Sequence, residues 1–351
     1  MPEPTPKRSF GTSALSRTDA IGQCYCLSLL GGGVFLEEFQ CTMALRYDEH
    51  KVPFVDFGNG VKLQFDYEEF SDKPSKEKAT NELRETPDVM EASIRKLREL
   101  IQQEKQLELP VDDESFMKRF LRPKKYYPES TFEMLKAFYH MKAKPNFISD
   151  RLTTKSIQNA LDDRAVQILP KRDQHGRRIL YMEMGAKWNC TKVPSMEVIR
   201  CTNLLMEMVG REPGTQLHGI VFVINFDRLS LSHISQFPPK FVKTVVDHGQ
   251  KHSPYRIKGI HIVNNARMFN IFFKIFKPFL GKKWSQRIFL HGVDFASLHD
   301  HIAPDCLPST LGGTYELPAY EGAVIGQLLD CYKEKFEEEE KYGYVSEVKE
   351  S

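Results

Sequence analysis

The sequence predicts an α/β protein in which a small all-helical domain precedes a domain built on a mostly parallel sheet. Between about residues 75 and 144, apolar residues recur at the three- and four-residue spacing of amphipathic helices. After about residue 150, continuous apolar runs typical of buried parallel strands alternate with helical stretches. The helix predicted over residues 265–280 has an apolar face too broad for a water-facing surface, so it must cover a core, line a cavity or enter lipid.

The composition is that of a globular protein. Of the 351 residues, 41% are hydrophobic and 27% are charged, and no run of about 18 apolar residues is available to cross a bilayer. A net charge of +2 excludes a uniformly basic nucleic-acid-binding protein but permits a local basic patch. The seven cysteines are odd in number and follow no metal-binding spacing, which favours reduced thiols in the cytoplasm.

Residues 1–74 are expected to form an N-terminal extension that is partly disordered. An apolar stretch near residue 25 follows a long polar segment and is interrupted by glycines at 31–33, so it makes a poor secretory signal. Met43 opens a segment that resembles an ordinary translation start. We therefore hypothesise that residues 1–42 are an alternative or mis-assigned leader outside the fold.

The helical domain is predicted over residues 75–148. Pro87 provides a start signal for a helix with a regular apolar stripe. A second, short helix around Phe120 is expected to end at Pro123, and a third is expected to begin at Pro128. These segments predict a small unit of three or four helices.

The sheet domain is predicted over residues 149–325. Its expected strands are 178–184, 220–224, 259–263 and 287–290. Its expected helices are 193–209, 236–250 and 265–280. Residues 326–351 are expected to form an acidic helical tail that ends in solvent.

The helix predicted over residues 265–280 carries most of its bulky side chains on one face, namely Met268, Phe269, Phe272, Phe273, Phe276 and Phe279. Lys282, Lys283 and Arg287 follow it directly. An apolar helix beside a group of cations favours a protein that handles lipid at a membrane surface. A helix buried in an ordinary core would carry the same stripe.

The common catalytic and metal-binding motifs are absent from the sequence. It contains no nucleophile elbow, no zinc-protease motif and no phosphate-binding loop, and its eleven histidines are dispersed. We therefore predict neither an enzyme nor a metal or cofactor site. An enzyme that acts on lipids would need an activated nucleophile, and Cys201 is the thiol expected near the pocket.

Segments taken in order resemble the CRAL-TRIO lipid-binding family, nearest the branch of α-tocopherol transfer protein, cellular retinaldehyde-binding protein and the clavesins. They are FLRPKKYYPESTFEMLKAFYHMK (120–142), GIVFVINFD (219–227), RIKGIHIVN (256–264), IFKPFLGKKWSQRIFLHG (275–292) and DCLPSTLGGTYE (305–316). The resemblance covers residues 75–325. It implies an apolar cavity that is floored by a five-stranded sheet and closed by a mobile amphipathic gate helix, here residues 265–280.

The resemblance also implies which residues line the cavity: Ile199, Thr202, Met206, Ile220, Leu229, Val245, Tyr255 and Ile260. Thr202 could offer one hydroxyl group to the polar end of a ligand. Asn203 and His248 are polar where the tocopherol carrier is apolar, which argues against specificity for vitamin E. Alternatively, these two side chains point to the backs of their helices and make only structural hydrogen bonds.

The positions that hold phosphoinositide headgroups in the family correspond here to Lys124, Arg256, Lys258, Lys283 and Arg287. The implied function is a non-enzymatic, cytoplasmic carrier that associates reversibly with membranes. It would bind a hydrophobic small molecule, such as a retinoid or a tocopherol-like lipid, and transfer it at membranes that contain phosphoinositides. The alternative is a phosphoinositide-binding trafficking adaptor of clavesin type, and neither function involves nucleic acid.

Overall fold

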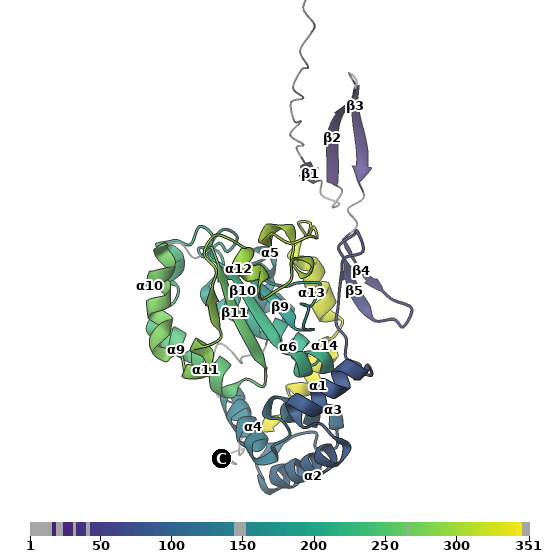
Figure 1. The fold of residues 1–351 in the computed structure, drawn as a ribbon, viewed down its shortest axis with the longest axis vertical. Helices are drawn as coiled ribbons and strands as arrows, with labels where there is room; N and C mark the ends of the chain where they lie inside the picture. The colour runs from purple at the N-terminus through teal and green to yellow at the C-terminus, as the bar shows by residue number, and fades with distance from the viewer. Residues whose placement is uncertain are drawn as a thin grey trace, which may run out of the picture.

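The computed structural model describes residues 16–18, 24–30, 33–39, 43–143, 152–264 and 267–345. A twisted central sheet lies above a bundle of helices formed by the preceding part of the chain (Figure 1). The sheet has the strand order β12-β11-β10-β9-β8. Among the described helices, none is both long and apolar enough to span a membrane.

The strands of the central sheet are β8 (Val166–Ile168), β9 (Arg178–Glu183), β10 (Ile220–Asn225), β11 (Ile257–Val263) and β12 (Ile288–Leu290). β9 to β12 pair in parallel, and β8 pairs antiparallel with β9. The four predicted strands and their mostly parallel arrangement are therefore confirmed. β8 was not predicted because its three residues are too short to show a periodic pattern.

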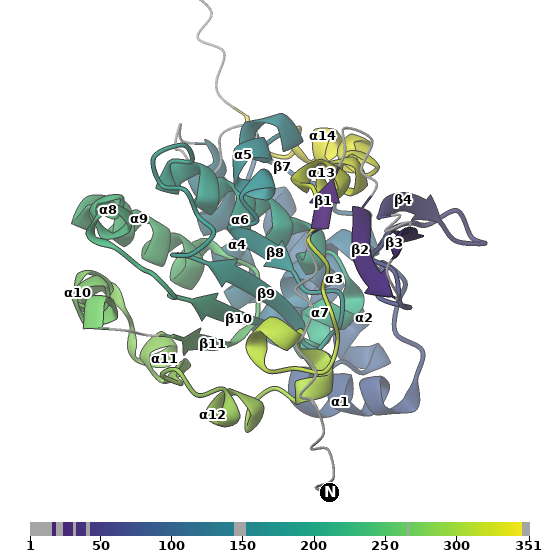
Figure 2. The same ribbon diagram turned by 90° about the horizontal axis from the view of Figure 1, so that it is seen from above.

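Alternate residues of the strands face two different layers. The even-numbered residues Leu180, Met182 and Phe222 belong to the core under α6 (Ser195–Gly210), whereas the odd-numbered Val221 and Val223 belong to a second core. Figure 2 places α6, α8 and α9 on one side of the sheet and α12 on the other. Both faces of the sheet are therefore covered, as its continuous apolar strands require.

The remaining helical segments of the sheet domain lie before, between and after its strands. They are α5 (Gln158–Asp162), α7 (Pro213–His218), α8 (Leu231–Ser235), α9 (Pro239–Asp247), a π-helix (His248–His252), α10 (Arg267–Phe276), a 3-10 helix (Lys277–Phe279), α11 (Lys282–Ser285) and α12 (Ala296–His299). Short 3-10 turns cover 154–157, 304–306 and 309–311. The three predicted helices are thus found, although 236–250 is divided between α9 and the π-helix, and residues 236–238 precede both.

The helical domain has a core of its own. This core is shared by α2 (Pro87–Gln103), α3 (Glu114–Leu121) and α4 (Pro128–Ala143). α1 (Lys73–Leu83) precedes them, and its Ala79 and Leu83 pack with Leu217 of α7 instead. Asp72, Thr86 and Asp113 cap the first three helices by accepting hydrogen bonds from backbone N–H groups. The expected helix end at Pro123 is confirmed to within two residues, because α3 ends at Leu121 and is followed by a single 3-10 turn, Arg122–Lys124. Proline occupies an early position of this turn that needs no N–H donor.

Part of the predicted N-terminal extension belongs to the core of the sheet domain. The strands β4 (Ala44–Tyr47), β5 (Pro53–Asp56) and β6 (Lys62–Gln64) form an antiparallel meander. Phe57 lies edge-on against Tyr320, with their ring centroids 5.3 Å apart. Residues 43–65 are therefore packed against the domain, which the sequence pattern did not indicate.

The proposed leader lies largely outside the described residues. Within it, β1 (Ser16–Thr18), β2 (Cys24–Leu30) and β3 (Gly33–Phe39) form a separate antiparallel sheet. The hypothesis that residues 1–42 are a mis-assigned leader stays a prediction.

The predicted acidic tail is partly packed against the fold, and its last part, residues 346–351, lies outside the described residues. It follows α13 (Gly322–Asp330) as α14 (Lys333–Glu339) and β13 (Gly343–Tyr344), which pairs with β7 (Leu107–Glu108) of the helical domain. Glu339 forms ion pairs with Arg119 at 2.9 Å and with Arg211 at 3.1 Å. One carboxylate thus joins the two domains, because it neutralises a buried guanidinium group from each.

Three histidines meet on the sheet face away from α6. His261 Nδ1 lies 3.0 Å from His291 Nε2, and the ring centroid of His301 is 5.1 Å from that of His261. Burial, followed by the nearby His291, His301 and Arg177, lowers the pKa of His261 to about 3. The unfolded chain therefore binds a proton below its ordinary pKa of about 6.5, while the folded chain stays neutral at this site.

We expect His261 to make the protein less stable in weak acid. As the pH falls from 7 to 5, the free energy of unfolding should decrease by about 2 kcal/mol at this site. The reason is that His261 takes up a proton in the unfolded chain but not in the folded one, where its pKa is lower. Urea titrations at both pH values should show that the free energy of unfolding decreases less for His261→Phe than for the wild type. An unchanged decrease in the variant would show that His261 is not the group responsible.

Candidate binding cavity and its cationic rim

A cavity of about 210 Å³ lies between the sheet and its covering helices. A single buried water needs about 10–15 Å³ on the same measure, so a molecule many times larger fits. The cavity is lined mainly by aliphatic, methionine and aromatic side chains, namely Met182, Met184, Ile199, Thr202, Asn203, Met206, Phe222, Ile224, Phe226, Phe237, Val245, Val246, His248, Gly249, Ser253, Ile257, Ile260, Ile262, Phe269, Phe272, Phe273, Phe276, Leu280, Trp284 and Ile288.

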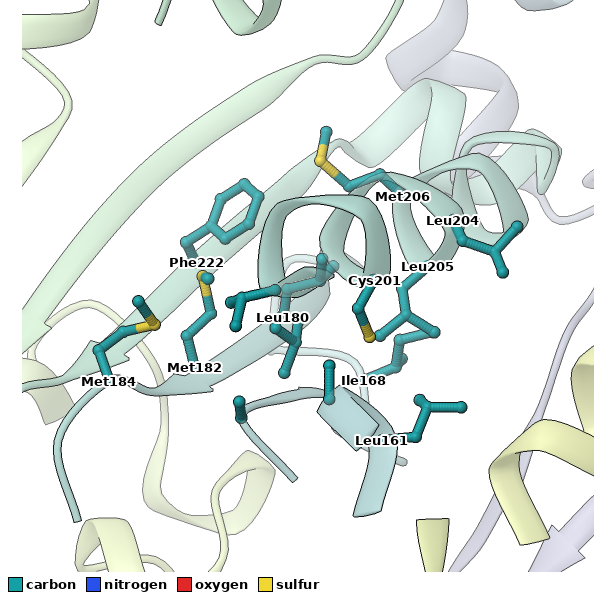
Figure 3. Packing of buried hydrophobic residues seen from close by; sticks show 14 of the residues in the cluster. Leu161, Ile168, Leu180, Met182, Met184, Cys201, Leu204, Leu205, Met206 and Phe222 are labelled. Carbon is teal, nitrogen blue, oxygen red and sulfur yellow. The ribbon is translucent and has the colours of Figure 1, made fainter. Parts of the chain in front are cut away.

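The floor of the cavity follows from strand alternation. Met182 of β9, Met184 directly after this strand and Phe222 of β10 are even-numbered and line the cavity from one face of the sheet. Figure 3 shows these three side chains on the side of the strands that faces α6. None of the three was predicted, although the alternation in the apolar strands would have identified them once the face toward α6 was known.

α10 forms one wall of the cavity. Phe272 is buried, and its ring centroid lies 5.0 Å from that of Phe226 and 5.1 Å from that of Phe237. Ile271 is on the outer side of the helix, where 46% of its surface is exposed. The helix therefore presents apolar side chains both to the cavity and to the surroundings.

Most of the predicted gate residues lie on this wall. Phe269, Phe272, Phe273 and Phe276 line the cavity, whereas Phe279 is half-buried beyond the end of α10 and does not line it. The side chain of Met268 lies outside the described residues.

Of the predicted cavity residues, Ile199, Thr202, Met206, Val245 and Ile260 line the cavity. The lining does not include Ile220, Leu229 or Tyr255. Ile220 is the first residue of β10 and is fully packed in the core, and Leu229 lies in the turn after this strand. The Tyr255 ring instead packs against Gly210, where an added Cβ would come within 2.3 Å of it.

The polar residues of the lining differ in what they can offer. Thr202 Oγ1 donates a hydrogen bond to the Val198 carbonyl oxygen at 2.8 Å, so its hydroxyl hydrogen is already used within the helix. Asn203 and His248 both line the cavity, which decides between the two orientations left open by the sequence.

Cys201 does not provide the nucleophile of a lipid-directed enzyme. It is a residue of α6, and its side chain is buried in the core between this helix and the sheet, as Figure 3 shows. Burial, and secondarily Glu197, raises the pKa of its thiol far above the ordinary value, so the reactive thiolate is not formed at neutral pH.

Cations gather near the amino ends of β11 and β12, and we call Lys124, Lys125, Arg256, Lys258, Lys283 and Arg287 the cationic rim. Burial, and then the charges of Arg287, Lys124, Arg256 and Lys125, lower the pKa of Lys283 below its ordinary value. This mutual influence requires the side chains to be close together. Lys125 was not predicted, although it adjoins Lys124 in the sequence.

The rim adjoins one end of the cavity. Ile257 lines the cavity between Arg256 and Lys258, and Ile288 lines it next to Arg287. The Arg287 guanidinium group also donates a hydrogen bond to the Ile257 carbonyl oxygen, which ties β12 to β11 at this end. An anion on the rim would therefore lie beside the apolar lining.

One carboxylate from the helical domain already contacts the rim. Glu82 of α1 accepts hydrogen bonds from Arg256 at 2.9 Å and from Lys258 at 3.2 Å through the same oxygen. These contacts hold the pKa of Glu82 below its ordinary value in spite of partial burial. For Lys124, Lys125, Lys283 and Arg287, no ion pair within 4.0 Å is found among the described residues.

The comparisons with known proteins agree with this geometry. A family model of the CRAL/TRIO domain matches residues 163–313. Clavesin-1 of Rattus norvegicus is 32% identical over 258 residues, which cover 72% of this chain and 71% of that protein. Clavesin-2 of Homo sapiens is 31% identical over 257 residues, which cover 72% of this chain and 78% of that protein.

Among solved structures, the crystal structure of Sfh5 matches with a TM-score of 0.44 at 14% identity, over 77% of this chain and 100% of that chain. The family model and relatives almost a third identical over most of both chains point to the same family. This chain belongs to the CRAL-TRIO family of lipid-binding proteins, on its clavesin branch.

Proposed function

We propose that the protein is a non-enzymatic, cytoplasmic carrier of a hydrophobic small molecule, such as a retinoid or a tocopherol-like lipid. It takes up this cargo in the cavity and transfers it at membranes that contain phosphoinositides. The observation that carries the proposal is an apolar cavity closed on one side by a helix whose outer face also bears an exposed isoleucine. Such a helix can exchange cavity contacts for lipid contacts at a membrane surface.

The cargo can be identified directly. Native mass spectrometry and solvent extraction of protein purified from its own tissue should yield one isoprenoid molecule per chain. An empty cavity, or a mixture of phospholipids only, would contradict the carrier function for this class of cargo.

We further infer that the cationic rim binds the phosphoinositide headgroup. Lys124→Ala together with Lys283→Ala should weaken binding to vesicles with phosphatidylinositol bisphosphate about tenfold or more, because both side chains lie in one cationic cluster. Lys192→Ala is a matched control, since this exposed lysine precedes α6 at the other end of the sheet. Vesicle flotation would measure the binding of the double variant and of the control. Equal binding of the double variant and the wild type would contradict the inference that the cationic rim binds the headgroup.

Glu82 should limit this binding. Its carboxylate competes with phosphate for Arg256 and Lys258, so Glu82→Gln is expected to strengthen vesicle binding about three- to tenfold at low salt. Glu77→Gln, on the same helix but paired with the exposed Lys73, should leave it unchanged. If Glu82→Gln weakens binding instead, the carboxylate holds the two cations in place rather than competing for them.

A trafficking adaptor of clavesin type is the second candidate, favoured by the 31–32% identity to the clavesins. Such an adaptor would bind phosphoinositide membranes through the same rim and would show little cargo transfer between vesicles. A transfer assay with fluorescent cargo therefore separates the two functions.

A further inference from the structure

The cavity has one polar region in an otherwise apolar lining. Apart from Thr202, whose hydroxyl group is bonded within its helix, the side chains with hydrogen-bonding N or O atoms are Asn203, His248, Ser253 and Trp284, whose ring packs against Gly249. His248 opens the π-helix His248–His252, and Ser253 follows it directly. Because residues five apart are joined by one π-helical turn, His248 and Ser253 are neighbours along the helix axis.

His248 presents a hydrogen-bond acceptor. Its Nδ1 lies 3.0 Å from the sulfur of Met141, and a thioether can only accept, so the ring proton is on Nδ1. Burial, followed by the nearby His252, lowers the pKa of His248 to about 4, which keeps the ring neutral at physiological pH. Nε2 therefore carries a lone pair, and within the described chain it accepts no hydrogen bond.

Ser253 presents an unused donor. Its Oγ is buried and has no hydrogen-bond partner among the described residues. A buried hydroxyl group without a partner is unfavourable, and a polar group of the cargo would relieve that cost. Nothing else in the described structure accounts for a serine in this lining.

We propose that His248 and Ser253 bind the polar end of the cargo and select a hydrophobic alcohol or phenol. A hydroxyl group can donate to His248 Nε2 and accept from Ser253 Oγ at once. An aldehyde or ketone can only accept and leaves Nε2 without a donor. A carboxylate would place a negative charge beside a neutral lone pair in an apolar cavity, which is less favourable still. The inference rests on the proposed carrier function and narrows its cargo to one chemical class.

Three ligands with one carbon skeleton test the selection: retinol, retinaldehyde and retinoic acid, each titrated into the full-length protein and followed by protein fluorescence quenching. The Kd for retinol is expected to be about tenfold lower than the Kd for retinaldehyde. The Kd for retinoic acid is expected to be the highest of the three. His248→Leu should raise the Kd for retinol about three- to tenfold and leave the Kd for the aldehyde nearly unchanged, because only the alcohol donates to Nε2. Ser253→Ala should raise the Kd for both ligands about three- to tenfold, because both ligand oxygens accept from Oγ.

Thr244→Val is the control, because its hydroxyl group donates in the same way to the Lys240 carbonyl oxygen at 3.0 Å and Thr244 does not line the cavity. Ser253→Ala should also retain the wild-type melting temperature, since Oγ has no partner to lose. Equal affinities for the three ligands, or a preference for retinol over retinaldehyde that survives in His248→Leu, would overturn the selection but leave the carrier function intact. Binding of none of the three would overturn the selection and the retinoid form of the carrier function together.

Discussion

Replacing Glu212 with alanine is expected to lower the free energy of unfolding by about 3–5 kcal/mol. Glu212 is completely buried and accepts hydrogen bonds from Arg178 at 2.9 Å and Thr215 at 2.7 Å, with Arg172 also 2.9 Å away. It further accepts the backbone N–H of Asp66 at 3.0 Å. Without the carboxylate, two guanidinium groups would remain in the interior with no counter-charge.

Urea denaturation would measure this loss, with the slope of the transition as a check that both proteins unfold in the same way. Glu77→Ala is the control, because its ion pair with Lys73 is 3.8 Å long and exposed, so its loss should cost less than about 1 kcal/mol. Glu212→Gln keeps the shape of the side chain, so its loss in free energy of unfolding should lie between those of Glu212→Ala and Glu77→Ala. A loss below about 1 kcal/mol for Glu212→Ala would mean that the arginines regain hydration by local rearrangement.

The parts of the fold that depend on local pattern could be predicted from the sequence. β9 to β12 are continuous apolar runs, and α10 has an apolar stripe, so both signals lie within short windows. The grouping of Lys124 with Lys283 was accessible only through the family resemblance, since these residues are far apart in the sequence. No periodicity relates two such positions.

Features that arise from contacts between distant segments could not be predicted. The charge run around Glu339 has the composition of a solvated helix end. Glu339 itself is largely buried, because its carboxylate forms ion pairs with Arg119 and Arg211. Likewise, Trp284 lines the cavity because Gly249 leaves room for its ring, with an added Cβ only 2.6 Å from it. In each case the partner, and not the residue itself, determines the environment.

The two faces of α10 should have separable functions. Phe272→Asp places a carboxylate in the cavity wall and removes burial worth about 1.5–3 kcal/mol, so cargo should dissociate at least about tenfold faster. Ile271→Asp changes the exposed face and should leave the affinity for cargo unchanged. It should slow cargo transfer to vesicles about tenfold, because the apolar contact with lipid is lost.

Asn270→Asp separates charge from loss of apolar surface. Asn270 is exposed on the same helix and is already polar, so this variant adds the negative charge without removing an apolar side chain. Cargo dissociation and vesicle transfer, measured for all three variants, give a definite pattern if α10 is a gate: Phe272→Asp affects dissociation, and Ile271→Asp affects transfer more than Asn270→Asp does. If Ile271→Asp and Asn270→Asp slow transfer equally, electrostatic repulsion explains both, and the outer face of α10 does not enter the membrane. If Phe272→Asp alone impairs both steps, α10 is a fixed part of the cavity wall, because a helix that opens at the membrane needs its outer face as well as its inner one.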